Sequence, residues 1–214
     1  MSSYLTAFVL AIIAIILAGV WWRYAARLHS MPCPSWLVFL LENPYVEALA
    51  GSARLLERAC VGPGMRILDV GSGPGRVTLA AAERVGPSGS VLALDIQEGM
   101  IRKLERRIAE RGIKNIETVL AGVGDGKLER SGFDRAFLVT VLGEIPDQAA
   151  ALQEVHEALR PGGMLSITEV FPDPHYQSRS RVRRLAEEAG FRFEESFGSW
   201  LAFTLNFSKL LSAA

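Results

Sequence analysis

The feature that most constrains the fold is an alternation of short apolar runs with amphipathic stretches between residues 62 and 190. The amphipathic stretches have helical spacing, and Gly112 and Gly190 stand where two of these helices would end. Strands that alternate with helices predict βαβ units and a largely parallel sheet. The expected strands are residues 66–70, 90–95, 116–121, 134–142 and 163–170, and the expected helices are 75–85, 98–112, 146–160 and 180–190.

Two more segments, 191–199 and 200–209, follow the last expected helix and are expected to form a pair of adjacent antiparallel strands. The fold class is therefore α/β, a Rossmann-like sheet with helices on both faces. Sheets of this kind bind ligands at the carboxyl ends of their parallel strands, so we expect the functional residues there.

Composition excludes several classes of function. The chain has 214 residues, which suffices for one domain and an extension, with 23 basic and 23 acidic side chains. A formal net charge of zero gives no electrostatic support for nucleic-acid binding. The two cysteines, Cys33 and Cys60, have no metal-ligand spacing, so we expect no metal site, and a reducing compartment fits better than a disulfide framework.

Near the start of the chain, residues 4–22 form a run of 19 residues without a charged side chain. As a helix the run would be about 28 Å long, close to the roughly 30 Å of a hydrocarbon core. A signal peptide would have a charged n-region and a shorter apolar run, and a buried core helix rarely extends this far without a charge. We therefore expect residues 1–28 to form a single membrane anchor. Arg23 and Arg27 then place the rest of the chain in the cytoplasm by the positive-inside rule.

Residues 29–61 are expected to connect the anchor to an α/β domain that spans residues 62–214. Two prolines interrupt residues 29–36, an apolar run occupies 36–41, and residues 44–60 have helical spacing. Two interpretations of this helix remain open. It either packs on the domain, or lies against the membrane as an interfacial helix or lid that borders the substrate entrance.

A glycine-rich loop follows the first expected strand. Its letters GSGPG, residues 71–75, allow positive φ and a close approach of the backbone to a ligand. Asp95 ends the next strand, where a carboxylate can accept hydrogen bonds from both ribose hydroxyls. A dinucleotide loop has the spacing G-x-G-x-x-G, whereas here G-x-G-x-G is followed by Arg76. The pattern therefore favours a nucleoside without a pyrophosphate.

Three segments resemble class I S-adenosylmethionine-dependent methyltransferases over about residues 62–208. ILDVGSGPG (67–75) is similar to their motif I, ALDIQEGMI (93–101) to their second motif, and EALRPGGMLSITE (157–169) to their turn into strand 5. The resemblance implies a seven-stranded sheet of order 3-2-1-4-5-7-6 with strand 7 antiparallel. Its closest subgroup contains quinone-ring, arsenite and small lipid methyltransferases, although Cys33 and Cys60 do not supply the arsenite pattern.

The resemblance also implies roles for individual residues toward S-adenosylmethionine. The glycine loop would lie against the methionine part, Asp69 would hold the loop or the methionine amine, and Asp95 would bind the ribose. Ile96 would flank the adenine, and Asp125, slightly late in the sequence, takes the place of the residue that meets the adenine amino group. The residues expected to bind the cofactor are Asp69, Gly71, Ser72, Gly73, Gly75, Asp95, Ile96, Asp125, Thr140 and Leu142, the last two near the sulfonium.

Methyl transfer mainly requires that donor and acceptor be aligned, and a base is needed only when the acceptor loses a proton. Glu144 and His175 are the expected catalytic residues because both lie just past a strand end. Asp147, Asp173, Glu169 and Tyr176 lie near the same pocket, with Asp147 better explained as a helix start and Asp173 as a turn.

The sequence thus predicts a membrane-anchored methyltransferase for a lipophilic acceptor, such as a lipid amine or a quinone. Two alternatives remain open. The domain could hold the cofactor without catalysis, as a scaffold or regulatory subunit, or it could methylate a soluble small molecule.

Overall fold

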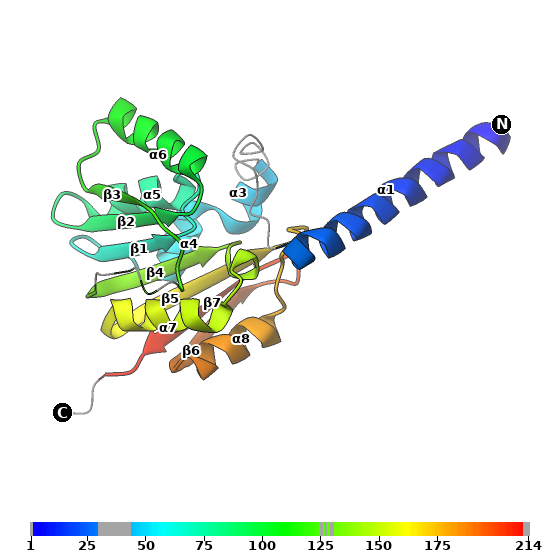
Figure 1. Cartoon of the computed structure of the whole chain (residues 1–214). Helices are drawn as coiled ribbons and strands as arrows, with labels where there is room; N and C mark the ends of the chain where they lie inside the picture. The colour runs from blue at the N-terminus through cyan, green and yellow to red at the C-terminus, as the bar shows by residue number, and fades with distance from the viewer. Residues whose placement is uncertain (1, 30–43, 125, 127, 129–130, 212–214) are drawn as a thin grey trace.

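The computed structural model describes residues 2–29, 44–124, 126, 128 and 131–211. Figure 1 shows a layered α/β domain from which one long helix, α1 (Ser2–His29), extends away. The predicted break at 29–36 and the apolar run at 36–41 lie mostly outside the described residues, as does Cys33.

The sheet has seven strands in the order β3-β2-β1-β4-β5-β7-β6, which confirms the order expected from the resemblance. β7 pairs antiparallel with both β5 and β6, and every other pair is parallel. The strands are β1 (Arg66–Val70), β2 (Ser90–Asp95), β3 (Ile116–Leu120), β4 (Phe133–Val139), β5 (Leu159–Val170), β6 (Phe191–Gly198) and β7 (Ala202–Lys209).

Helices cover both faces of the sheet (Figure 1). On one face Leu55, Val77 and Ala81 pack against Ile67 and Phe137 of the sheet. On the other face the buried apolar side chains of α7 and α8 pack against Leu138, Leu165 and Ile167. The helices of the domain are α3 (Pro44–Ala50), α4 (Ser52–Arg58), α5 (Arg76–Val85), α6 (Glu98–Arg111), α7 (Gln148–Ala158) and α8 (Arg179–Glu188).

The single helix expected at 44–60 is wrong, because the chain forms α3 and α4 with a break at Gly51. Gly51 has an extended ψ of 138°, and a Cβ at this position would lie 2.6 Å from the carbonyl oxygen of Glu47. The spacing of apolar residues continues through the break, so periodicity alone did not reveal it.

The strand expected at 134–142 ends earlier, at Val139. Thr140 has a φ of +55°, which a strand does not tolerate, and residues Leu142–Glu144 form a short 3-10 helix, η2. The polypeptide therefore turns at the carboxyl end of β4, at the edge where ligands are expected.

Large apolar side chains of α1 are exposed on several sides of the helix. Leu5, Phe8, Leu10, Leu17 and Trp21 are each more than 60% exposed. Within the described part of the chain, no helix meets the combined length and apolarity that crossing a membrane requires.

Asp147 caps the N-terminus of α7, as expected from the sequence. Its carboxylate accepts a hydrogen bond from the backbone N–H of Ala150 at 2.9 Å. Replacing Asp147 by Ala should lower the free energy of unfolding by about 1 kcal/mol, because one helix N–H loses its partner. Urea titration measures the difference. Asp147→Asn, which keeps a capping oxygen, is the matched control, and equal losses in both variants would contradict the assignment.

Candidate functional site

The glycine loop joins β1 to α5 and contains three glycines with positive φ. A Cβ on Gly71 would lie 2.1 Å from Cγ2 of Val141, and a Cβ on Gly75 would lie 2.4 Å from Cδ1 of Leu104. These two glycines are therefore required by packing within the protein. A Cβ on Gly73, whose φ is +54°, would meet nothing within 4 Å. Gly73 is thus the glycine of this loop whose backbone faces open space.

Asp95 connects this loop to the end of β2. One carboxylate oxygen accepts the N–H of Gly73 at 2.9 Å, and the other accepts the N–H of Gln97 at 2.8 Å. Burial raises the pKa of this carboxyl, and the two N–H donors act in the opposite direction. Each carboxylate oxygen can accept a second hydrogen bond, so Asp95 can hold the loop and still accept from a ligand.

Asp69, in β1, is almost completely buried, and its hydrogen-bond partner is another residue of the protein. Its carboxylate accepts the hydroxyl of Thr78 on α5 at 2.6 Å. Burial is the main cause that raises its pKa to about 6, against the effect of the Thr78 hydrogen bond. Of the two roles that the resemblance implied, the observed contact supports holding the loop through α5.

The turn after β4 lies against the glycine loop on one side. Val141 packs on Gly71, as the close approach of their atoms shows. Thr140 donates its backbone N–H to the carbonyl of Thr168 on β5 at 2.8 Å and its hydroxyl to the carbonyl of Val139 at 2.7 Å. A non-glycine residue held at positive φ stores strain, and such residues gather at functional sites.

The other side of this turn meets the segment 171–178, which follows β5. A Cβ on Gly143 would lie 1.9 Å from the carbonyl oxygen of His175, so the two backbones are in direct contact. The same carbonyl accepts the side-chain amide of Gln177 at 2.7 Å. The turn therefore links the glycine loop to the segment that carries His175.

The predicted catalytic residues Glu144 and His175 come from these two touching segments. His175 is buried, and its backbone N–H donates to the carboxylate of Asp173 at 2.7 Å, which confirms a turn-forming role for Asp173. Glu144 is half-buried at the end of η2. The structure thus brings both residues to the carboxyl edge of β4 and β5, and their catalytic roles stay predictions.

Glu169, at the end of β5, is the buried acidic residue of this edge. Its side chain is 1% exposed, one carboxyl oxygen accepts the N–H of Gln177 at 3.1 Å, and Oε1 has no hydrogen-bond partner among the described residues. Burial raises its pKa to about 8, and the nearby charges of Asp173 and Glu144 act in the same direction. Glu169 therefore keeps its proton at neutral pH.

Two of the predicted cofactor residues, Leu142 and Asp125, are not seen at the surface of the candidate site. Leu142 is fully buried and packs in the core beside α7, so its side chain has no surface with which to line the site. Its expected place near the sulfonium stays a prediction, which the burial of the side chain does not support. Asp125 lies outside the described residues, so its expected role toward the adenine stays a prediction.

Glu154 also belongs to this end of the sheet, and sequence reasoning did not identify it. Glu154 lies on α7, is largely buried, and its carboxylate accepts the backbone N–H groups of Gly124 and Leu128, the latter at 2.6 Å. It thereby fixes the loop after β3, on the adenine side of the expected site. Its neighbours Gln153 and Glu157 are exposed, and the sequence held no signal that distinguished Glu154 from them.

The residues present fit an adenosyl cofactor. The hydroxyl of Ser72 is buried without a hydrogen-bond partner among the described residues, and Gly73 faces open space beside it. Ile96 is 59% exposed directly after Asp95, where an adenine ring would cover an apolar side chain. The loop would thus offer a hydroxyl, a carboxylate and an apolar platform to an adenosyl group.

A family model described as a methyltransferase domain matches residues 62–191. The chain belongs to the methyltransferase-domain family. Its fold and its glycine loop are those expected from the resemblance to class I S-adenosylmethionine-dependent methyltransferases.

Curated relatives agree with this assignment. The nocamycin O-methyltransferase of Saccharothrix syringae is 36% identical over 56% of this chain and 43% of its own length. The demethylmenaquinone methyltransferase of Geobacillus kaustophilus is 33% identical over 51% of this chain and 47% of its own length. The methyltransferase thus spans about half the length of these relatives.

A solved structure supports the fold independently. A SAM-dependent methyltransferase from Aquifex aeolicus superposes with a TM-score of 0.77 at 23% identity, covering 84% of this chain and all of the other. The likeness covers more of the chain than the family model does.

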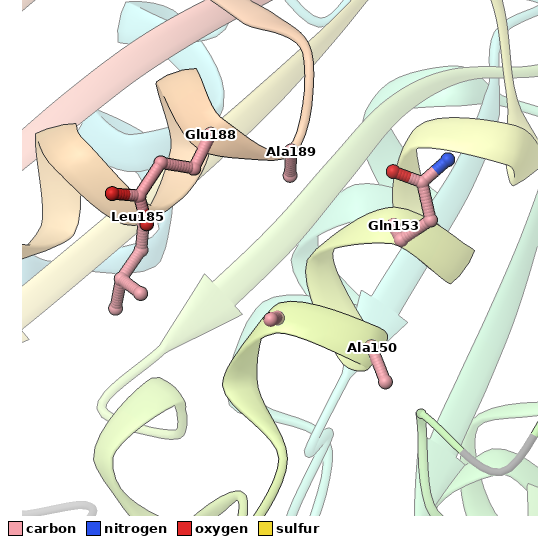
Figure 2. A pocket seen from close by; sticks show the side chains of 6 residues that line it. Ala150, Gln153, Leu185, Glu188 and Ala189 are labelled. Carbon is pink, nitrogen blue, oxygen red and sulfur yellow. The ribbon is translucent and has the colours of Figure 1, made fainter.

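A groove of about 290 Å³ lies elsewhere on the methyltransferase, between α7 and α8. Figure 2 shows residues that line it, Ala150 and Gln153 on α7 and Leu185, Glu188 and Ala189 at the end of α8. None of the predicted cofactor residues lines it. The groove is therefore separate from the candidate site.

Asp95→Ala should weaken binding of S-adenosylmethionine by roughly 1.5–3 kcal/mol, the scale of hydrogen bonds to a charged group. Calorimetric titration of the folded variant gives the affinity directly. Asp134→Ala is the matched control, because Asp134 accepts from Arg66 and Arg160 at the opposite edge of the sheet. Unchanged affinity in Asp95→Ala would remove Asp95 from the cofactor site.

The raised pKa of Glu169 predicts a pH-dependent stability. The folded chain holds this proton up to about pH 8, whereas the unfolded chain releases it near 4.5. The contribution of Glu169 is therefore full below pH 4.5, and the free energy of unfolding falls as the pH rises to about 8. The slope is at most about 1.4 kcal/mol per pH unit.

Urea titration between pH 6 and pH 8 checks this dependence. Glu169→Gln, which resembles the protonated carboxyl, should show a smaller loss of stability over this range than the wild type does. Parallel pH profiles for the two proteins would show that Glu169 does not titrate there.

Proposed function

We propose that this methyltransferase is held at a membrane by α1 and transfers the methyl group to a lipophilic acceptor, such as a lipid amine or a quinone. The observation that carries the proposal is the exposure of large apolar side chains along α1. Tyr4, Phe8 and Trp21 are each more than 60% exposed to water in the isolated chain.

Exposed apolar side chains around a whole helix are costly in water. Along α1 they occur at successive positions, including Leu5, Phe8, Val9 and Leu10, and so point in several directions around the axis. A helix that is apolar on all sides is found buried in a large core or in a membrane. Since Figure 1 shows α1 extending away from the domain, a bilayer is the surrounding that we propose for it.

The charged residues that flank the apolar run of α1 predict the orientation of the anchor. Residues 4–22 carry no charged side chain, and Arg23 and Arg27 follow them. The positive-inside rule places these arginines, and with them the catalytic domain, on the cytoplasmic side of a single-pass anchor. A tether raises the local concentration of an acceptor that is itself in the membrane, which favours a lipophilic substrate.

We propose that the site aligns the methyl donor with the acceptor, and that a base removes a proton when the acceptor carries one. When bound, S-adenosylmethionine supplies a methyl group already activated by the positive sulfur. Asp95, Gly73 and Ser72 would hold it against the glycine loop. Glu144 and His175 lie at the adjacent edge, where either residue can take a proton from an acceptor placed over β4 and β5.

Among the named relatives, one is a methyltransferase of demethylmenaquinone and another of nocamycin. Both names describe an organic small molecule as the acceptor, which supports the same class here. Incubation with labelled S-adenosylmethionine and a total membrane lipid extract tests the proposal. Label in polar compounds alone would overturn the lipophilic acceptor, and cofactor binding without any transfer would favour a non-catalytic scaffold.

Deleting residues 1–28 should release the methyltransferase from membranes and leave cofactor binding intact. No predicted cofactor residue precedes Asp69, so the loss of α1 leaves that site complete. Membrane flotation and calorimetry measure the two properties.

Carbonate extraction of the full-length chain then distinguishes a helix that spans the membrane from one bound at its surface. Resistance to extraction is expected for a spanning anchor, and release would indicate a helix at the surface. If the deleted chain still floats with membranes, or no longer binds the cofactor, α1 is not a separate anchor.

A further inference from the structure

The tip of the hairpin between β6 and β7 carries an exposed tryptophan. Trp200 is 69% exposed, and its ring centroid lies 5.7 Å from that of Phe171, which follows β5. Tyr45, near the start of α3, is 47% exposed and donates its hydroxyl to the carbonyl of Phe171 at 3.2 Å. Tyr176 packs edge-on against Phe171 with ring centroids 6.3 Å apart. We call these four residues the aromatic patch.

The backbone of this hairpin tip is held in place by the neighbouring segment. The carbonyl of Trp200 accepts the hydroxyl of Tyr176 at 3.0 Å. Arg179 donates to the two carbonyls before it at 2.7 and 3.0 Å, and the backbone N–H of Phe171 donates to the carbonyl after it at 2.7 Å. The tip is therefore fixed while the indole of Trp200 stays in water. An exposed aromatic group on a fixed backbone indicates a surface that meets a partner.

The arginines of α8, which begins beside the patch, are already bound within the protein. Arg183 pairs with Glu187 and Arg184 with Glu188, at 2.8 and 2.9 Å. The guanidinium of Arg179 is bonded to the hairpin carbonyls. Phosphate groups would have to compete with these bonds. The aromatic side chains, rather than the arginines, are therefore what this surface offers to a partner.

The chain enters the domain beside the aromatic patch. Tyr45 is the second residue of α3, and fourteen residues, 30–43, separate α3 from the end of α1. A chain of that length spans at most about 50 Å. The patch is thus tethered to whatever surrounds α1, and a short tether raises the local concentration of that surface.

We propose that the aromatic patch rests in the headgroup region of the bilayer that holds α1, with Trp200 and Tyr45 inserted at the interface. The inference rests on the proposed function, because the tether brings a bilayer close only if α1 is in one. Tryptophan and tyrosine favour the membrane interface, since their apolar rings carry a polar group. Docking through Phe171 and Tyr176 would turn the carboxyl edge of β5, which carries His175, toward the lipid surface.

A protein partner fits this surface less well because the patch is small. An aromatic side chain buries about 150–250 Å² at most, whereas a stable protein interface buries roughly 800 Å² on each partner. Trp200 and Tyr45, the two strongly exposed side chains of the patch, fall well short of that area even together. A domain that is already tethered needs only a weak contact to settle in one orientation on a bilayer.

The test places one tryptophan at a time in the full-length chain. The chain has four tryptophans, and Trp21→Phe, Trp22→Phe and Trp36→Phe together leave Trp200 alone. A second variant keeps Trp21 alone and reports on α1. The matched control replaces all four tryptophans by Phe and adds Leu210→Trp. Each variant is reconstituted in phosphatidylcholine vesicles with or without bromine in the upper acyl chains, and bromine quenches a tryptophan that touches it. Binding of S-adenosylmethionine shows that each variant is folded.

Trp200 and Trp21 should both lose emission in the brominated vesicles, and the emission of Trp200 should shift to shorter wavelength. The tryptophan at position 210 should keep its emission. Leu210 is 56% exposed, but it follows β7, which runs antiparallel to β5, so it lies at the opposite end of the sheet. Replacing part of the lipid by anionic phosphatidylglycerol should leave the quenching of Trp200 unchanged, because the arginines of α8 are already bound.

Quenching of Trp21 without quenching of Trp200 would overturn the inference and leave the anchor intact. Quenching of Trp200 alone would support the patch and overturn the anchor, and quenching of neither would overturn both. Equal quenching at position 210 would mean that the domain has no fixed orientation, which contradicts the inference. Two further results would also contradict it. One is quenching of Trp200 that requires the anionic lipid, and the other is an unquenched blue shift that grows with protein concentration, the sign of a second copy on the patch.

Discussion

The close contacts of two glycines, Gly71 with the side chain of Val141 and Gly143 with the backbone of His175, are the constraint on which the site depends. With no side chain at either position, the turn after β4 lies directly between the glycine loop and the segment 171–178. Any Cβ at Gly71 would overlap Val141, and any Cβ at Gly143 would overlap the carbonyl of His175. The glycine loop and the segment 171–178 are therefore joined through this short turn.

Hydrogen bonds accepted by carboxylates fix the segments around this turn. Asp95 binds the N–H of Gly73, Asp69 binds the hydroxyl of Thr78, and Glu154 binds the N–H groups of Gly124 and Leu128. Each of these acidic groups is largely buried, and each has donors that stabilise its charge or its lone pairs. Glu169 differs, because one of its oxygens has no donor among the described residues.

Sequence periodicity predicted the sheet well. β1 and β2 have the predicted bounds, and the strand order and the antiparallel β7 follow from the resemblance. The strands of a sheet that is buried on both faces are continuous apolar runs, so they are easy to recognise in the sequence. The break at Gly51 and the early end of β4 at Val139 were not predicted, because each depends on a backbone conformation, at Gly51 and at Thr140, that apolar spacing does not report.

The candidate site was predicted in part for the same reason. Gly73, Asp95 and Ile96 are neighbours of strand ends, so their positions follow from the fold once the strands are known. The contribution of Glu154 comes from α7, and Leu142 is buried although it follows the turn at Thr140. Neither could be read from residue spacing along one element.

The place of β7 has a consequence for biosynthesis. β7 lies between β5 and β6, although residues 202–209 come last among the strands in the order of translation. During vectorial synthesis β6 has no neighbour in the sheet until β7 emerges, so the edge of β5 stays open until then. The ribosome must therefore release nearly the whole domain before the sheet is complete, whereas α1 precedes every strand.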